Sequence, residues 1–71
     1  MKQKKIILKG IILQSLSNNL YKIKLIKNNK LVLGYLCGKM RKNYIRILPG
    51  DKVKLEFSIY DENRCIIKYR Y

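Results

Sequence analysis

Apolar and polar residues alternate along several short stretches of this chain, a period of two that is typical of β-strands with one buried face. The clearest stretch covers residues 52–59. Its apolar positions are Val53, Leu55, Phe57 and Ile59, and its polar positions are Lys52, Lys54, Glu56 and Ser58. This stretch predicts a strand whose apolar side chains lie in a core and whose polar side chains face water.

Four further segments are rich in Ile, Leu, Val and Tyr and have the length of strands. They are Ile6–Ser15, Tyr21–Leu25, Leu31–Leu36 and Cys65–Arg70, separated by the turn-forming residues Ser17–Asn19, Lys27–Lys30, Pro49–Asp51 and Tyr60–Asn63. In the first segment, Gly10 predicts a bulge or a sharp bend. In the last, Cys65, Ile67 and Tyr69 are expected on one face, and Ile66, Lys68 and Arg70 on the other.

The connection between the third and fourth strands, residues 38–46, carries too many charges for a buried strand and predicts a loop or a single helical turn. Five short strands, one of which bends early, suit a small closed barrel without exposed edges. Three strands, a helical connection and two more strands follow one another in the order of an OB-fold. An SH3-like barrel is the alternative, and the long connection favours the OB-fold. The 71 residues are expected to form one all-β domain.

The charge of the chain points to its partner. Seventeen Lys and Arg against four acids give a net charge of +13. Repulsion between these positive charges opposes a compact fold unless a polyanion neutralises them. The phosphates of a nucleic acid neutralise them, and their condensed counterions are released on binding. An anionic membrane is the alternative, but apolar runs such as Ile11–Leu13 are far short of the ~20 residues needed to span one. Nucleic acid is therefore the expected partner, and no membrane interaction is expected.

The sequence offers little for catalysis or for metal binding. It contains no histidine, the commonest general acid or base. Its acids lie near turns or on the solvated face of a strand rather than in a paired arrangement. Cys37 and Cys65 lack the further ligands that a zinc site requires, and both are expected to pack as small apolar residues. We expect no enzymatic activity, no cofactor and no metal.

Cations and hydrogen-bond donors crowd into residues 39–46. They are Lys39, Arg41, Lys42, Asn43 and Arg46, with Tyr44 among them. Arginine presents a planar fork to phosphate and stacks on bases, and tyrosine offers a further stacking face. We interpret this segment as an RNA-contacting loop on a barrel whose core it hardly supports. Burial in the core is the alternative for Tyr44 and Ile45.

A second basic set lies on the predicted strands. Its members are Lys22, Lys24, Lys52, Lys54, Lys68 and Arg70. Each of these is ordinarily part of a solvated strand face, but together they build a positive surface. In OB-folds the second and third strands and the adjoining loops bind nucleic acid, so Tyr35 and Tyr60 could stack bases there. Burial in the core is the alternative for Tyr35.

Residues 38–53 read Gly-Lys-Met-Arg-Lys-Asn-Tyr-Ile-Arg-Ile-Leu-Pro-Gly-Asp-Lys-Val. This run closely resembles the signature of the translation initiation factor 1 family of bacteria and plastids. Weaker agreement extends to Gly10, Leu16, Asn18, Tyr21-Lys22-Ile23 and Tyr60-Asp61, so the resemblance covers nearly the whole chain. Leu33-Gly34-Tyr35 and Ile47–Asp51 are most similar to plastid members.

The resemblance implies an OB-fold of the S1-like type that binds the A-site region of the small ribosomal subunit through 16S-type rRNA and cooperates with initiation factors 2 and 3. Carried over onto this sequence, the expected RNA-binding residues are Lys39, Arg41, Lys42, Asn43, Tyr44, Arg46, Tyr60, Arg64, Lys68 and Arg70. The family usually has Gly-Arg where this chain has Cys65-Ile66, which removes one basic contact. Lys2, Lys4 and Lys5 replace acids that are usual in the family.

The start of the chain shows no transit peptide, so the resemblance to plastid-encoded members leads us to expect a monomer in the plastid stroma, with the bacterial cytoplasm as the alternative. A cold-shock-type RNA chaperone and a small basic ribosomal protein are the competing functions. The chaperone normally carries a glycine-aromatic stacking motif on its second and third strands, which residues 21–35 do not show.

Overall fold

The computed structural model describes residues 5–17, 19–42, 46–61 and 63–71. Its elements, in chain order, are β1 (Lys5–Ser17), β2 (Leu20–Leu25), β3 (Leu31–Leu36), α1 (Gly38–Lys42), β4 (Lys52–Ser58) and β5 (Arg64–Arg70). The predicted strands and the helical turn after the third of them are thus confirmed. Among the described residues, no helix is both long and apolar enough to cross a membrane.

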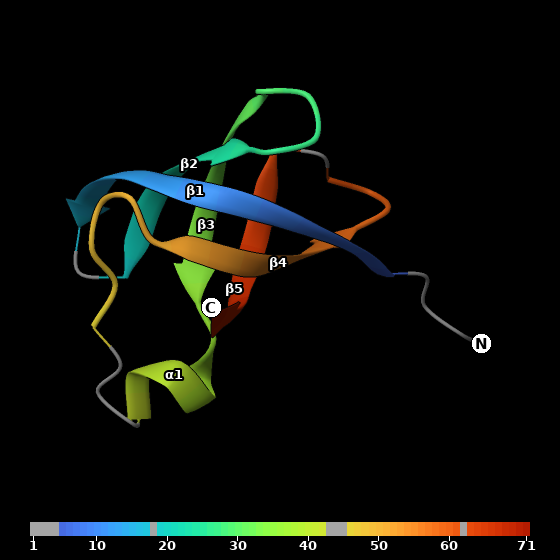
Figure 1. The fold of residues 1–71 in the computed structure, drawn as a ribbon. Coiled ribbons are helices and arrows are strands. Elements are labelled where there is room, and N and C mark those ends of the chain that lie inside the picture. Colours follow the sequence, from blue (N-terminus) through green and yellow to red (C-terminus); the bar gives the residue numbers. More distant parts are fainter. Residues whose placement is uncertain (1–4, 18, 43–45, 62) are drawn as a thin grey trace.

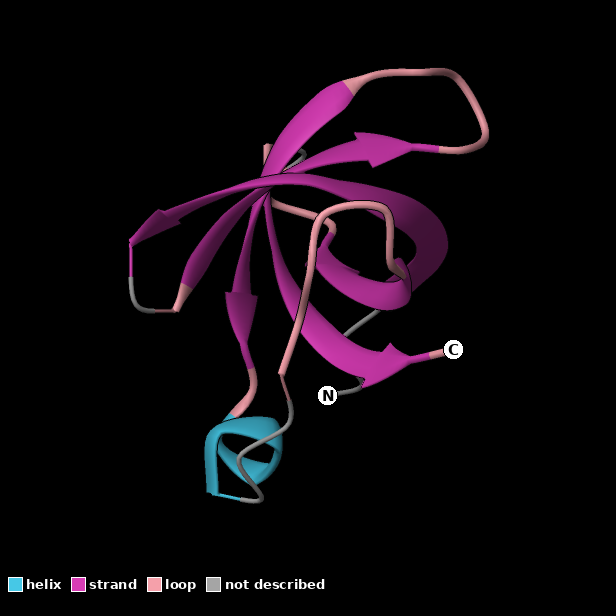
Figure 2. Cartoon of the chain, turned by 60° about the vertical axis from the view of Figure 1, so that its left-hand side comes forward, coloured by secondary structure: helices cyan, strands magenta, loops and turns pink. Residues whose placement is uncertain are grey.

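The strands close into a barrel in the order β1-β2-β3-β5-β4 (Figures 1 and 2). Neighbouring strands are antiparallel except β3 and β5, which run parallel from Leu33 to Leu36 and from Arg64 to Ile67. Parallel neighbours need a crossover, and here the chain makes it through α1 and β4. A five-stranded barrel with a helix between the third and fourth strands is the OB-fold arrangement, as the long connection indicated.

Strand β1 is long enough to pair with two neighbours, with β4 over residues 5–11 and with β2 over residues 10–17. Figure 1 shows it as a long curved ribbon. Of the two alternatives predicted at Gly10, the bulge is wrong, because the first register shift falls further along, between Ile12 and Gln14. A Cβ at Gly10 would stand 2.6 Å from Cγ2 of Ile23 and 2.9 Å from Cδ1 of Leu55, so this glycine admits close packing inside the barrel.

The core follows the period of two seen in the sequence. Its buried residues are Ile12, Tyr21, Ile23, Leu25, Val32, Leu36, Met40, Ile47, Val53, Leu55, Phe57, Cys65 and Ile67. Ile59 is 43% exposed, contrary to its expected burial, because β4 ends one residue earlier at Ser58. Tyr35 is 41% exposed, so the alternative of a core position for this ring is wrong.

The connection from β3 to β4 supports the core more than the sequence indicated. Met40 on α1 is 3% exposed and Ile47 beyond it is 6% exposed, and both belong to the buried cluster. The interpretation of residues 39–46 as a loop that hardly supports the core is therefore wrong for Met40, which anchors α1 to the barrel. Tyr44 and Ile45, for which burial was the alternative, lie outside the described residues.

Candidate nucleic-acid interface

A hollow of about 650 Å³ lies where α1 begins beside β4 and the end of β5. We call it the basic groove, and its lining residues are Cys37, Gly38, Lys39, Lys54, Lys68, Tyr69 and Tyr71. Three of these side chains are lysines and two are tyrosines, and none of the lining residues is an acid. The groove therefore offers positive charge and aromatic surface together, the two features that single-stranded nucleic acid requires.

The pairing of the strands places these side chains side by side. Lys54 of β4 pairs with Lys9 of β1 on one side and with Tyr69 of β5 on the other. Because Val53 and Leu55 point into the core, the intervening Lys54 must point outward. A row of two cations and one aromatic ring thus crosses three strands on the outer surface.

Tyr69 reaches this surface because of a bulge in β5. The pairing passes from Leu55–Ile67 to Lys54–Tyr69 and so skips Lys68. An extra residue in one strand reverses the alternation beyond it. Tyr69 is consequently 56% exposed, and the prediction that it shares the inner face with Ile67 is wrong.

Tyr71 is held in place from both sides. Its backbone N–H donates to the carbonyl of Lys52 at 2.9 Å, and its ring packs edge to face against Tyr69 with the ring centres 5.3 Å apart. The Nζ atoms of Lys9 and Lys52 stand 5.5 and 5.9 Å from the centre of the Tyr71 ring. Such cation–π contacts keep the lysines close to an aromatic surface on which a base could stack.

Arg70 ties the segment beyond α1 to the barrel. Its Nη1 donates to the carbonyl oxygen of Arg46 at 2.8 Å and lies 3.8 Å from Oδ2 of Asp51. That same carboxylate oxygen accepts a hydrogen bond of 2.9 Å from the backbone N–H of Leu48. Arg70 thus has a structural bond besides the RNA contact expected of it, while its side chain is still 43% exposed.

The expected RNA-binding residues divide between two ends of the barrel. Lys39 and Lys68 line the basic groove, and Arg46 and Arg70 are joined at the same end. Tyr60 and Arg64 lie at the opposite end of β5, since the six residue steps from Arg64 to Arg70 span about 20 Å.

The other members of the expected set are placed less fully. Lys42 is exposed at the end of α1. Asn43, Tyr44 and the side chain of Arg41 lie outside what the structure describes.

Sequence reasoning missed three residues of this surface, Lys9, Tyr69 and Tyr71, and placed Lys54 only in the second basic set. From the sequence, Lys54 was interpreted as one member of a solvated strand face. It lies beside Lys39 and Lys68 only because the barrel closes, which the sequence does not show. One signal was present in the sequence, the Tyr69-Arg70-Tyr71 spacing, which places two rings on one side of an extended chain.

The two cysteines are free thiols in different surroundings. Cys37 is half-buried at the groove, whereas Cys65 is buried and its Sγ donates to the carbonyl of Leu33 at 3.4 Å. Burial, assisted by the nearby negative charge of Asp61, raises the pKa of Cys65 from 9.0 to about 12. Cys65 is therefore a protonated core thiol. No three Cys, Asp or Glu side chains of the described residues gather as a metal site.

Comparison with known proteins gives a consistent result at the level of sequence. The chain is 49% identical over 70 residues to the chloroplastic translation initiation factor IF-1 of Ceratophyllum demersum and 51% identical to that of Antirrhinum majus. In both cases the match covers 99% of this chain and 90% of the relative. No family model matches the chain.

Solved structures agree in fold. The solution structure of translation initiation factor 1 from the Wolbachia endosymbiont of Brugia malayi has a TM-score of 0.76 and 30% identity, covering 94% of this chain and 78% of that one. Eukaryotic translation initiation factor 5A from Methanococcus jannaschii, at 12% identity, has a TM-score of 0.68 over 94% of this chain and 44% of its own. The second likeness shows the barrel fold alone.

Proposed function

This chain belongs to the translation initiation factor IF-1 family, whose members are translation factors and not enzymes, and we propose that it binds the small ribosomal subunit through 16S-type rRNA at the A-site region. There it would assist the assembly of the initiation complex together with initiation factors 2 and 3. The protein acts as a monomer in this proposal.

The basic groove beside the Lys39–Arg46 connection is the observation that carries this proposal. Lys39, Lys54 and Lys68 converge on it, and Tyr69 and Tyr71 form its aromatic side. Lysines contribute charge for phosphates, and exposed tyrosines stack on bases regardless of sequence. A surface of this composition is suited to an RNA strand and unsuited to a protein surface that is itself basic.

The barrel anchors the described residues on both sides of the charged connection. Met40 and Ile47 fix the start and the end of this connection in the core, and the bond from Arg70 to the carbonyl of Arg46 holds its far side. Lys39 and Arg46, which lie next to these anchors, lose less conformational entropy on binding than the cations of a free loop. We therefore assign RNA contact to the described cations of this connection, Lys39, Lys42 and Arg46, together with the adjoining groove.

The plastid stroma is the proposed location. The chloroplastic members at 49–51% identity support it, while the likeness to a bacterial factor keeps the bacterial cytoplasm as the alternative.

Chemical footprinting of small-subunit RNA with and without this protein tests the proposal. Protection should appear at A-site nucleotides and should fade when Lys39→Ala, Lys54→Ala and Lys68→Ala are combined. Lys27→Ala, an exposed lysine in the β2–β3 turn, is the matched control and should leave protection intact. Protection elsewhere on the subunit, or protection that the triple substitution does not weaken, would contradict the proposed interface.

A salt wash separates an initiation factor from a ribosomal protein. An initiation factor held by phosphates should leave the subunit as salt rises, because each contact releases counterions that the salt replaces. A structural ribosomal protein should remain bound at one copy for each subunit. Quantifying the protein in washed subunits decides between them.

A further inference from the structure

The basic groove concentrates positive charge that no acid on its own surface balances. Lys39, Lys54 and Lys68 line it together with aromatic and small side chains. Among the described residues, no carboxylate forms an ion pair with Lys39 or Lys54, and Lys68 reaches only Glu56, at 3.9 Å. The groove is therefore suited to an anion that comes from outside the chain.

Lys54 carries a charge that is partly shielded from water. It is half-buried in the middle of β4, between a neighbour on β1 and another on β5. Loss of hydration destabilises an ammonium group unless an anion or a hydrogen-bond acceptor compensates for it. A phosphate bound in the groove would supply that compensation.

The bulge in β5 brings a second cation and an aromatic ring to the same place. Two residues of the bulged strand, Lys68 and Tyr69, face a single residue of β4, Lys54. Both are exposed whereas Ile67 before them is buried, so both side chains lie on the outer surface. Cross-strand neighbours have Cβ atoms about 4.5–5.5 Å apart. A planar ring stacked on Tyr69 would thus have two ammonium groups near its edge.

Tyr69 offers a better stacking surface than Tyr71. The ring of Tyr71 has the Nζ atoms of Lys9 and Lys52 over it, at 5.5 and 5.9 Å from its centre. The two tyrosine rings meet edge to face, with 75° between their planes, and Tyr69 remains 56% exposed. A base can therefore stack on Tyr69, while Tyr71 and its two lysines form the wall beside it.

The dimensions of the groove suit a compact ligand. Its volume of about 650 Å³ lies within the range of about 300–1,000 Å³ that is usual for small-molecule sites. Its three lysines come from α1, β4 and β5 and converge on one hollow. An RNA strand spreads its charge, with one phosphate for each nucleotide, whereas a free nucleoside triphosphate gathers its charges on adjoining phosphates. Convergent lysines match the second arrangement.

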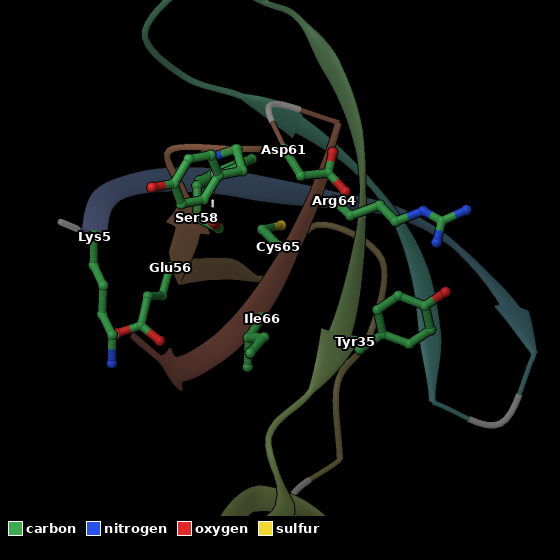
Figure 3. Close-up of a pocket in the computed structure, with 10 residues that line it drawn as sticks. Lys5, Tyr35, Glu56, Ser58, Asp61, Arg64, Cys65 and Ile66 are labelled. Carbon is green, nitrogen blue, oxygen red and sulfur yellow. Dashed lines mark hydrogen bonds and ion pairs between the residues drawn. The ribbon is translucent and has the colours of Figure 1, made fainter. Parts of the chain in front are cut away.

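The hollow at the other end of β5 does not suit such an anion. Figure 3 shows this hollow, and Glu56 and Asp61 are among the side chains that line it. The carboxylate of Glu56 lies 3.6 Å from Nζ of Lys5, so the charge of this lysine is partly neutralised. Carboxylates repel phosphate groups. A polyphosphate is therefore directed to the basic groove.

We propose that the basic groove also binds a free nucleoside triphosphate, with the base on Tyr69 and the phosphates among Lys39, Lys54 and Lys68. The inference rests on the proposed function, because it makes the nucleotide a competitor of RNA for the same lysines. Occupation of the groove lowers the affinity of the protein for the small subunit as the nucleotide concentration rises. Binding to the subunit thereby becomes sensitive to the level of free nucleotide.

An NMR titration of the full chain without RNA tests the site by itself. The ligands are ATP, AMP and inorganic triphosphate, all at the same ionic strength. ATP should bind about tenfold more tightly than AMP, which lacks the polyphosphate. It should bind about fivefold more tightly than inorganic triphosphate, which has no base to stack on Tyr69. The amide signals that shift should be those of the groove residues, in α1, β4 and the end of β5.

Single substitutions separate stacking from charge. Tyr69→Leu should reduce the affinity for ATP to that for inorganic triphosphate and leave the latter nearly unchanged. Lys54→Ala should weaken the binding of both ligands by about fivefold or more. Lys27→Ala, an exposed lysine in the β2–β3 turn, removes the same charge and should leave both affinities nearly unchanged. Thermal melting of each variant excludes unfolding as the cause.

Displacement of a fluorescent single-stranded RNA tests the competition. ATP should release the RNA from the wild type at a lower concentration than inorganic triphosphate does. This advantage of ATP should vanish in Tyr69→Leu.

Three results would overturn the inference without touching the proposed function. The first is equal affinity of the wild type for ATP and inorganic triphosphate, which would reduce the site to general electrostatic attraction. The second is a loss of ATP affinity in Lys27→Ala as large as that in Lys54→Ala. The third is bound ATP that leaves the RNA in place. Absence of A-site protection in footprinting, with ATP binding intact, would contradict the proposed function alone.

Discussion

Gly34 stands at a position of β3 where the barrel leaves no room for a side chain. A Cβ there would collide with Cδ1 of Ile23 and approach Sγ of Cys65 and Cγ1 of Ile67 to 3.3 Å each. We expect Gly34→Ala to destabilise the fold by about 1–3 kcal/mol, the usual cost of overpacking a core. Gly38→Ala is the matched control, because nothing lies within 4 Å of a Cβ at that position. Urea unfolding of both variants measures the difference, and equal stability would refute the close packing at Gly34.

The two cysteines should differ in reactivity. The raised pKa of Cys65 keeps its thiol protonated and buried, so iodoacetamide should label Cys37 first and Cys65 only on unfolding, as mass spectrometry would show. Because the folded state holds the Cys65 proton between pH 9.0 and about 12 while the unfolded state loses it, the stability from this group is complete below pH 9 and is lost as pH rises toward 12. Wild-type stability should fall more steeply across this window than that of Cys65→Ala. Parallel pH profiles would contradict the assignment.

At the scale of elements, the connection from β3 to β4 combines a core anchor with a charged surface. Arg46→Ala should leave thermal melting nearly unchanged, because Arg46 is exposed and surface substitutions usually stay within about 0.5 kcal/mol. The charge pattern of the sequence predicts the same for Arg41→Ala. Each should lower small-subunit affinity by about tenfold or more if it makes a bidentate contact. Met40→Ala, in contrast, removes a buried side chain and should cost about 2–5 kcal/mol of stability. Lys22→Ala, at a position remote from the groove, is the control and should have a smaller effect on affinity. If the two arginine variants melt at a lower temperature than the wild type, or bind the small subunit as tightly as it does, then the connection is not an RNA-binding element.

At the scale of the whole molecule, the net charge of +13 makes the affinity for the small subunit depend on ionic strength. With about six phosphate contacts, raising salt from roughly 50 to 200 mM should weaken small-subunit binding by about a thousandfold. The combined Lys39→Ala, Lys54→Ala and Lys68→Ala variant should show a shallower salt dependence, because it releases fewer counterions. Sedimentation or filter binding at several salt concentrations provides the slopes, and a flat response of the wild type would rule out the electrostatic mechanism.

The sequence by itself determined the strands, most of the core and the family. An alternation of apolar and polar residues indicates which side chains of a strand are buried, and it can be recognised from neighbouring residues alone. Val53, Leu55 and Phe57 were therefore predictable as core residues. The charge and the run of residues 38–53 likewise stand in the sequence and point to RNA and to the family.

Only the tertiary structure decided how the charges are grouped. Lys39, Lys54 and Lys68 come from three elements and meet because the barrel closes, and Tyr69 faces outward because β5 bulges at Lys68. Arg64 and Arg70 share a strand yet belong to opposite ends of the molecule. Register, bulges and closure depend on partners that are distant along the chain, so no local pattern encodes them, and the basic groove became visible only in the folded barrel.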